Sequence, residues 1–332
     1  MQYRKLGNTD IECSVVGFGV WTVTAGWWGN YTAEEAIRLM RKAYELGVTV
    51  FDTAPTYGPV GYAEEIVARA LADVRDRVVY STKFGYDTEI DWSYEGHKER
   101  PQRTDPAFTR RAVDTSLTRL GTDVIDILQL HNPKMTHIEQ DDLWATLEDL
   151  KANGKVRAYG ISIGPKIGWR DEGLKALRTR RMDAFMLIHN LLEQDPGRDF
   201  IEAARPTNTG LMVRVPHSSG LLEGTYTKDT TFDESDHRSF RTRDWLMEGL
   251  AKLEKLEFLT DGMAIGQAAI KWLLAEPLIT SVLPNIYRDE QLEEFVAAAD
   301  KPDLTDEQMT LVADLYDRNF DLVASGKRPP PR

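Results

Sequence analysis

Three apolar segments of the chain each end in a side chain that can hold or transfer a proton. The segment 48–51 ends at Asp52, with Tyr57 one short turn later; 78–82 ends at Lys83, and 125–130 ends at His131. A phenol, with a pKa of about 10, is a poor acid at neutral pH, but a neighbouring ammonium group stabilises the phenolate and lowers that pKa. Brought together, these four side chains would form a proton-donating site.

Each of the four side chains would have a separate task. Lys83 would lower the pKa of Tyr57, Asp52 would hold Lys83 in place through an ion pair, and His131 would hydrogen-bond the carbonyl oxygen of a substrate. Hydride would then reach the carbonyl carbon while Tyr57 protonates the oxygen. Taken singly, each residue has an ordinary explanation: a turn or helix cap, a solvated charge, a satisfied polar group. The chemical interpretation therefore depends on their convergence.

The elements between these residues predict how convergence is achieved. Short apolar strands alternate with amphipathic helices along the chain; strands are predicted at 15–19, 48–52, 78–83, 125–130, 156–162, 184–188, 211–215 and 279–283. Helix boundaries are marked by a capping box at Thr32–Glu35 with a stop at Gly47, and by Asp105-Pro106 with a stop at Gly121. Eight such repeats predict an α/β fold, a (β/α)8 TIM barrel, in which all strand C-termini meet at one rim.

The chain ends also fit one barrel domain, predicted over 1–325. Residues 3–13 read as a β-hairpin, 245–259 and 305–324 as extra helices near the C-terminus, and 326–332 as a disordered Pro-rich tail. Cys13, the single cysteine, forbids an internal disulfide and is expected to pack in the hairpin. The start lacks the apolar region of a secretory signal, so a cytoplasmic location is expected.

Composition excludes several classes of function. The 332 residues carry a formal net charge of -12, which gives no support to nucleic-acid binding. No run of eighteen apolar residues predicts a membrane span. The histidines are scattered, without an H-x-H or H-E-x-x-H pattern, so no metal site and no metal-dependent hydrolase is expected. A small-molecule carbonyl compound or sugar is the partner that the four reactive residues indicate.

In order, Phe51-Asp52-Thr53-Ala54 with Tyr57, Thr82-Lys83, and Leu130-His131 with Pro133 resemble the motifs of the aldo-keto reductase family. The resemblance runs from Tyr3 to about Leu315. It implies an oxidoreductase that transfers hydride between a nicotinamide cofactor and the carbonyl or alcohol carbon of an aldehyde, ketone or sugar. It also implies that the N-terminal hairpin plugs the bottom of the barrel.

The resemblance assigns cofactor contacts without a Rossmann motif, which position 22, a Thr, rules out. Ser162 would hydrogen-bond the carboxamide, the 216–222 loop would wrap the pyrophosphate, and Arg288 would reach a 2'-phosphate, so NADP(H) is expected, with NAD(H) still open. The full predicted set is Gly19, Trp21, Asp52, Ser162, Asn190, Arg214, Pro216, Ser218, Gly220, Leu222, Arg288, Gln291 and Glu294, the last two on the adenine side.

Several positions depart from the family pattern. Where the family usually has Asn, Gln, Gly and Asn, this chain has Ile163, Met186, Asn285 and Phe295. The nicotinamide carboxamide is therefore expected to have fewer hydrogen-bond partners. Asn190 or His189 are the predicted substitutes. Arg214 stands where a Tyr commonly stacks on the nicotinamide. Over the ring, its charge would repel the oxidised, cationic form and favour the reduced one. The alternative is that Arg214 turns to the pyrophosphate.

The substrate pocket is expected to be aromatic. Trp21, Trp27 and Trp28 follow the first strand, and the irregular loop 85–105, a predicted flap, carries Trp92 and Tyr94; the predicted substrate contacts are Trp21, Trp27, Trp28, Tyr57, Trp92 and His131. The alternative interpretation of this loop is a surface insertion that has no role in substrate binding. Two further functions stay open: a sugar dehydrogenase working oxidatively with Tyr57 as base, and a nucleotide-binding redox sensor with little turnover.

Overall fold

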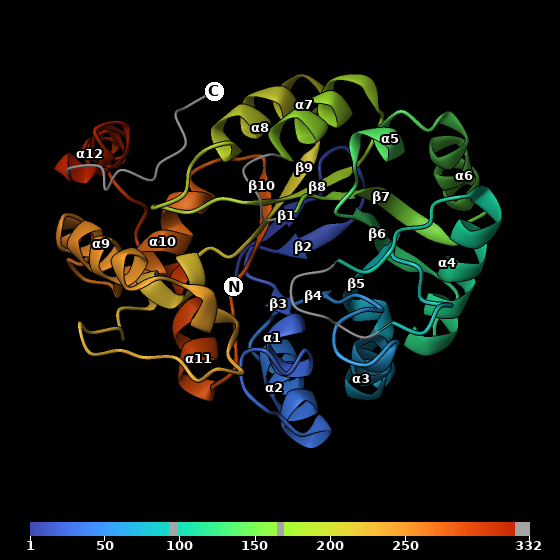
Figure 1. Ribbon diagram of the computed structural model, residues 1–332, viewed down its shortest axis with the longest axis horizontal. Coiled ribbons are helices and arrows are strands. Elements are labelled where there is room, and N and C mark those ends of the chain that lie inside the picture. Colours follow the sequence, from blue (N-terminus) through green and yellow to red (C-terminus); the bar gives the residue numbers. More distant parts are fainter. Residues whose placement is uncertain (93–98, 165–168, 323–332) are drawn as a thin grey trace.

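The computed structural model describes residues 1–92, 99–164 and 169–322, and its centre is a barrel of eight parallel strands (Figure 1). The strands pair in the order β10-β9-β8-β7-β6-β5-β4-β3. The ring is completed where Val282 donates to the carbonyl of Val15 at 2.8 Å and accepts from Gly17 at 2.9 Å. The predicted (β/α)8 barrel is therefore confirmed.

The barrel strands follow the predicted segments closely. They are β3 (Phe18–Gly19), β4 (Val50–Asp52), β5 (Val79–Phe84), β6 (Ile125–His131), β7 (Val156–Ser162), β8 (Ala184–Ile188), β9 (Gly210–Arg214) and β10 (Ile279–Leu283). The first strand is shorter than predicted, because Val16 makes only an isolated bridge to Val282.

Helices surround the barrel on all sides (Figure 1). Those that alternate with the strands are α2 (Ala33–Glu45), α3 (Tyr62–Leu71), α4 (Pro106–Leu120), α6 (Asp141–Ala152), α7 (Arg170–Thr179), α8 (Gly197–Ala204), α10 (Ile265–Leu274) and α11 (Asp289–Ala297). Short helices α1 (Trp21–Thr24) and α5 (Met135–Ile138) lie in loops, and α9 (Arg243–Glu254) and α12 (Asp306–Asp317) lie outside the ring. The short helix α5 directly precedes α6 and is separate from it.

Helix ends obey the local signals in the sequence. The Thr32 hydroxyl accepts from the Glu35 amide at 3.2 Å, while Glu35 accepts from the Thr32 amide at 2.8 Å, which is the predicted capping box. Asp105 caps α4, and Gly121 ends it with a φ of 62°. These ends fix where the preceding and following strands begin, and so where the strand-end residues lie.

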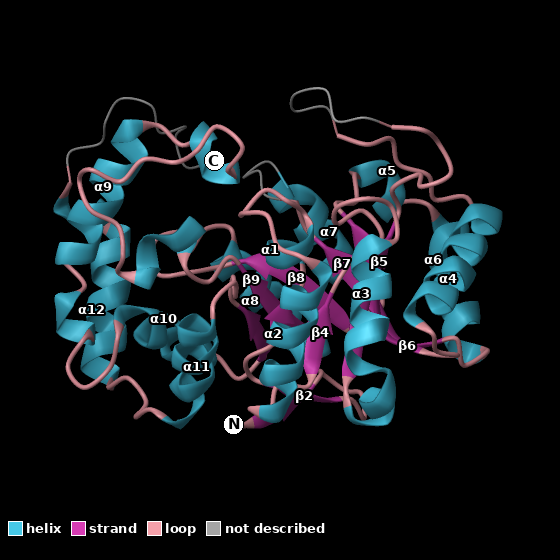
Figure 2. Cartoon of the chain, turned by 90° about the horizontal axis from the view of Figure 1, so that it is seen from below, coloured by secondary structure: helices cyan, strands magenta, loops and turns pink. Residues whose placement is uncertain are grey.

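The N-terminal hairpin closes one end of the barrel. Strands β1 (Tyr3–Lys5) and β2 (Glu12–Ser14) pair antiparallel, and Leu6, Ile11 and Cys13 pack in one cluster with residues that face the barrel interior. Figure 2 shows β2 at the end of the barrel opposite α1 and α5. Cys13 is fully buried, and burial raises the pKa of its thiol to about 12, so it packs rather than reacts. The rim at the other end is left for function.

Across 1–92, 99–164 and 169–322, no helix has the length and apolar character needed to cross a bilayer. The C-terminal tail predicted to be disordered and the middle of the 85–105 loop, including Tyr94, lie outside the described residues.

Candidate active site

A buried ion pair lies at the rim, where β4 and β5 end. Lys83 Nζ donates to Asp52 Oδ2 at 2.6 Å and to the carbonyl oxygen of Thr53 at 2.9 Å. The other carboxylate oxygen of Asp52 accepts from the Ser81 hydroxyl at 2.8 Å and from Gln129 Nε2 at 3.3 Å. Both charges are therefore compensated, and neither side chain is free to rotate.

Tyr57 and His131 lie beside this pair. Lys83 Nζ is 4.9 Å from the centroid of the Tyr57 ring, so its charge lies beside the phenol. The His131 ring lies 6.0 Å from the Tyr57 ring, at 81° to it. The structure thus brings together the four side chains that the sequence placed at separate strand ends, and the geometry allows a carbonyl oxygen to meet a phenol and an imidazole.

Burial sets the protonation states of the group. Burial raises the pKa of Tyr57, although Lys83 opposes this; the expected net lowering by the ammonium is therefore wrong for the protein without cofactor. Burial disfavours the charged form of Lys83, but Asp52 and Tyr57 outweigh it and raise its pKa. Burial, with the charges of Lys83 and Arg214, holds the pKa of His131 well below its usual 6.5. At neutral pH the site holds a phenol, an ammonium and a neutral imidazole.

The end of β6 is fixed by residues that sequence reasoning missed. Gln102 Nε2 donates to the carbonyl oxygens of His131, at 2.8 Å, and Asn132, at 2.9 Å. The Tyr86 ring lies 5.0 Å from the His131 ring, and its phenol accepts from Asn132 Nδ2 at 2.7 Å. Tyr86 and Gln102 face each other across an antiparallel bridge, a contact that the irregular sequence of this loop does not reveal.

A cavity of about 470 Å³ opens beside Tyr57. Its lining residues come from three loops: Trp21, Ala25, Trp27, Thr56, Gly58, Pro59, Val60, Ile90, Asp91, Trp92 and Arg100. Three of the predicted indoles, Trp21, Trp27 and Trp92, are therefore in place. Trp28 is not among them: it is buried, packs against Trp21 and Tyr287, and lies under the guanidinium of Arg238 at 4.4 Å, so its assignment to the substrate is corrected.

The loop after β9 forms a tight turn suited to an anionic group. Val215, Ser218, Ser219 and Gly220 have φ values of 56°, 47°, 56° and 93°, which turn successive amides in a way typical of anion-binding loops. A Cβ at Gly220 would meet the Tyr226 hydroxyl at 2.1 Å. Pro216 and Leu222, at either end, are buried. The predicted pyrophosphate contacts therefore share one turn.

The segment 224–244 covers this turn. Tyr226 donates to the Ser219 carbonyl at 2.8 Å, and Arg241 donates to the Ser219 hydroxyl at 2.9 Å. Farther along, the His237 amide donates to the carbonyl of Trp27 at 2.7 Å, and the two rings stack at 5.7 Å. The segment 224–244 thus connects the 216–222 loop to the aromatic loop after β3. Its composition did not indicate this role.

Ser162 lies at the end of β7, beside His131. Ser162 pairs with His131 in the sheet, and its hydroxyl contacts only the sulfur of Met186, at 3.4 Å. It is available to a ligand. Gly19, the last residue of β3, pairs with Asp52 at the same rim.

Asn190 is committed elsewhere. Its amide nitrogen donates to Glu193 at 2.9 Å and to the Val215 carbonyl at 3.0 Å, while its oxygen accepts from the Glu193 amide at 2.9 Å. These bonds build the loop after β8 and leave no donor for a carboxamide. His189 packs against Trp272 of α10, at 4.9 Å. Both substitutes predicted from the sequence are therefore corrected.

Arg214 is directed across the barrel mouth. Its Nη2 donates to the carbonyl oxygen of Ile163 at 2.9 Å, and its Nε is buried without a partner in the described chain. Burial lowers the pKa of its guanidinium, while Tyr57 and Asp52 oppose the change. This bond holds the guanidinium beside the end of β7.

A partly buried carboxylate, Glu223, directly follows the 216–222 loop. Glu223 Oε2 accepts from Gln291 Nε2 at 2.8 Å and from the Tyr287 hydroxyl at 3.1 Å, whereas Oε1 is buried and unpartnered in the described chain. Burial raises the pKa of Glu223 to about 7. Arg288 is exposed and lies over the Tyr287 ring at 5.2 Å. The sequence analysis missed Glu223, which follows the predicted pyrophosphate loop directly.

The remaining adenine-side positions are partly apolar. Phe295 is buried and its ring lies 4.3 Å from that of His217, so it supports the 216–222 loop from below. Glu294 is partly buried, and burial raises its pKa. Asn285 accepts from the Thr22 hydroxyl at 3.4 Å, which links this loop to α1.

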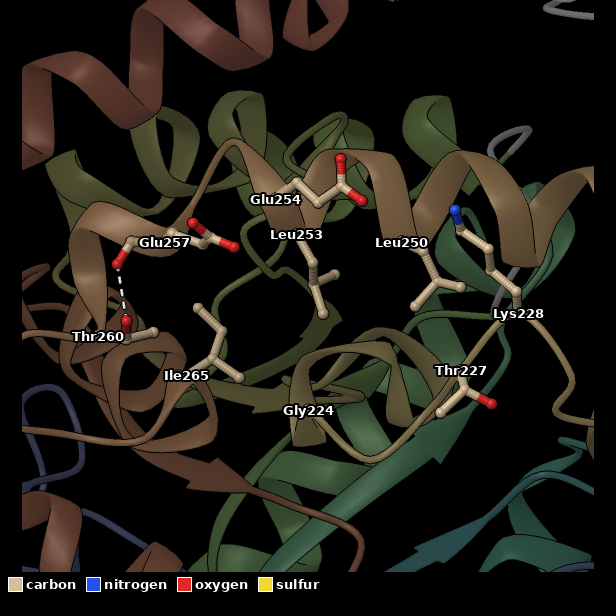
Figure 3. Close-up of a pocket in the computed structure, with 9 residues that line it drawn as sticks. All are labelled: Gly224, Thr227, Lys228, Leu250, Leu253, Glu254, Glu257, Thr260 and Ile265. Atoms are coloured by element: carbon tan, nitrogen blue, oxygen red, sulfur yellow. Dashed lines mark hydrogen bonds between the residues drawn. The ribbon is translucent and has the colours of Figure 1, made fainter.

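A second hollow, of about 430 Å³, lies between α9 and the segment 224–228. Figure 3 shows Leu250, Leu253 and Ile265 pointing into it, with Lys228 and Glu254 at its edge. None of the predicted site residues lines it.

The ion pair generates a test that needs no substrate. Lys83→Met leaves Asp52 buried without its cation, and we expect it to lower the free energy of unfolding by roughly 3–5 kcal/mol. Lys83→Met with Asp52→Asn should recover much of that loss, as measured by urea unfolding. The exposed pair Arg198–Asp317, 2.6 Å apart, is the control, and its removal should change stability by about 1 kcal/mol or less. Equal losses in the single and double variants would contradict the coupling.

The chain is similar to several known oxidoreductases over nearly its whole length. The NADH-specific methylglyoxal reductase of Escherichia coli is 29% identical over 328 residues, which cover 95% of this chain and 98% of that protein. The L-glyceraldehyde 3-phosphate reductase of Escherichia coli is 31% identical over 320 residues, covering 90% and 87%. The solved structure of a glycerol dehydrogenase from Gluconobacter oxydans superposes with a TM-score of 0.81, at 26% identity and 98% coverage of both chains.

A model of the Aldo/keto reductase family matches residues 15–317, nearly the whole barrel. Members of this family are oxidoreductases that use nicotinamide cofactors and act on small carbonyl compounds or sugars. The chain therefore belongs to the aldo/keto reductase family.

Proposed function

We propose that this protein interconverts a carbonyl compound and its alcohol with a nicotinamide cofactor, using Tyr57 as the general acid. The observation that carries the proposal is the contact of Tyr57 with the buried Lys83–Asp52 pair, next to His131 and the aromatic cavity. A perturbed phenol and imidazole beside a cavity are the features expected of an acid–base site.

The side chains divide the work of carbonyl reduction. Tyr57 keeps its proton at neutral pH, because burial raises its pKa, and neutral His131 has an N–H to donate to the same carbonyl oxygen. As the proton leaves Tyr57, the adjacent Lys83 ammonium stabilises the phenolate that forms. Asp52 keeps that ammonium charged and in position. The bound nicotinamide would supply the hydride.

The residues present fit such a cofactor. Within the described residues, the Ser162 hydroxyl contacts only a sulfur atom and the buried Glu223 Oε1 accepts no hydrogen bond. Val215, Ser218, Ser219 and Gly220 have left-handed backbone conformations. A dinucleotide would supply a carboxamide, phosphates and ribose hydroxyls to these groups. Gly19, Trp21 and Arg214 would contact its nicotinamide half, and Arg288, Gln291 and Glu294 its adenosine half.

The same group also serves the oxidative direction, in which Tyr57 as a phenolate would accept the proton of an alcohol. The similarity to a glycerol dehydrogenase favours keeping this direction as a second candidate. Turnover with aldehydes and with polyols, compared at the same pH, separates the two.

Replacing the phenol tests its role as an acid. Tyr57→Phe is expected to lower kcat/KM for aldehyde reduction by about 10² to 10⁴, the usual range for a positioned acid. The Kd for the reduced cofactor, measured by fluorescence, should stay within about twofold. Tyr44→Phe, on α2 and away from the site, is the matched control. A Tyr57→Phe enzyme with full activity would refute the assignment.

The charge of Arg214 is proposed to bias the site toward reduced nicotinamide. Arg214→Tyr should strengthen binding of the oxidised form relative to the reduced form by roughly tenfold, equivalent to about 1.4 kcal/mol. Arg214→Lys keeps the charge and should keep the ratio. Fluorescence titration of both forms gives the ratio, and an unchanged value in Arg214→Tyr would dispose of this effect.

Two residues act in opposite directions on the choice between NADP(H) and NAD(H). Arg288 has no ion pair with any described residue and offers its charge to a 2'-phosphate, which favours NADP(H). The carboxylate of Glu223 instead accepts hydrogen bonds from a ribose diol and repels a phosphate. Besides burial, the groups that act on Glu223 are Tyr287, Arg238, Gln291, Arg288 and Tyr226. We therefore propose that NADP(H) is preferred when Glu223 is neutral.

This proposal predicts a pH-dependent cofactor preference. With the pKa of Glu223 raised to about 7, the side chain is neutral below that pH and charged above it. The ratio of Kd for NADPH to Kd for NADH should therefore rise as pH increases through 7. Glu223→Gln is the control, because its ratio changes with pH only through ionisation of the 2'-phosphate itself. The rise in the native protein should exceed the rise in this variant. Identical pH trends in both proteins would show that Glu223 plays no part.

A further inference from the structure

Arg100 is a buried guanidinium at the wall of the substrate cavity. It is 7% exposed and lines the cavity with Trp21, Trp27 and Trp92. Its Nη1 donates to the carbonyl oxygens of Asp87, at 2.8 Å, and Ile90, at 3.3 Å. These bonds use one edge of the guanidinium and fix its position in the loop.

The rest of this guanidinium is not compensated. Its Nε is buried and has no hydrogen-bond partner, and no carboxylate of residues 1–92, 99–164 or 169–322 lies within the 4.0 Å of an ion pair. Asp91, on the same cavity wall, makes no ion pair with it. A buried charge is unfavourable without a counter-ion. The free N–H groups of an arginine match the paired oxygens of a phosphate or carboxylate.

Arg100 is tied rigidly to the catalytic group. The chain around it forms an antiparallel turn, in which the Asp87 amide donates to the Pro101 carbonyl at 2.8 Å and the Arg103 amide to the Gly85 carbonyl at 2.8 Å. Gln102, two residues on, holds the backbone of His131. The cavity also includes Thr56 and Gly58, the two neighbours of Tyr57. One cavity therefore joins the Tyr57 loop to Arg100.

We propose that Arg100 binds an anionic group, a phosphate or a carboxylate, on the carbonyl substrate. This inference rests on the proposed function for the position of the carbonyl, at Tyr57 and His131. The indoles of Trp21, Trp27 and Trp92 would enclose the carbon chain between the carbonyl and the anion. Substrates with an anionic end then bind better than neutral compounds of the same length.

Binding of unreactive analogues tests the site without turnover. Glycerol, glycerol 3-phosphate and glycerate are titrated into the full chain while tryptophan fluorescence is followed. The native protein should bind one of the two anions at least tenfold more tightly than glycerol, and the comparison of the anions shows whether phosphate or carboxylate is recognised. Arg100→Gln should remove this preference, because it removes the charge and leaves an amide.

Arg103→Gln is the matched control, since Arg103 lies in the same turn but pairs with Glu89 and Asp105 on the surface. It should retain the preference. Arg100→Lys keeps the charge but loses the paired N–H groups, so it should retain only part of the preference. If circular dichroism shows that Arg100→Gln is unfolded, this partial loss in Arg100→Lys, against full retention in Arg103→Gln, is the readout. Equal binding of anions and glycerol by the native protein, or the same loss in Arg103→Gln, would overturn the proposal. Because no cofactor is added, loss of reductase function would leave this result unchanged.

Discussion

The buried ion pair between Asp52 and Lys83 is the interaction on which the rest of the site depends. Charges removed from water are stable only when their bonding capacity is used, and here Ser81 and Gln129 complete the carboxylate while the Thr53 carbonyl completes the ammonium. These partners come from adjacent strands β4, β5 and β6, whose register sets the distances. The barrel therefore supplies the hydrogen bonds that stabilise this buried ion pair.

The pair determines what its neighbours can do. Lys83 next to Tyr57 does not make the phenol a strong acid, because burial outweighs the ammonium. It does provide a charge that stabilises the phenolate as the proton leaves. The same ammonium helps keep His131 neutral, so that the imidazole acts by hydrogen bonding rather than by charge. Under the proposed function, two donors with different roles would thus face one carbonyl oxygen.

Much of this arrangement was predictable from the sequence, because an apolar run that ends in a charged residue marks a strand end, and a barrel gathers strand ends. The direction of the Tyr57 pKa was not, since burial depends on packing between distant segments. Asn190 was misassigned because a polar residue at a strand end can equally build the loop that follows it, as its bonds to Glu193 show. Arg100 and Glu223 were missed because no periodic pattern distinguishes a buried charge from the exposed charges around it.

The ionisation of Tyr57 gives the most direct test of this account. The protein labelled with ¹³C at the tyrosine ζ carbon is titrated by NMR without cofactor, and the signal of Tyr57 is identified by its loss in Tyr57→Phe. Because burial raises the pKa of this phenol above the ordinary value of 10.0, its signal should keep the position of the protonated form through pH 10. Ionisation of Tyr57 below pH 10 would contradict the account, since the Lys83 ammonium would then outweigh burial in setting the pKa of this phenol.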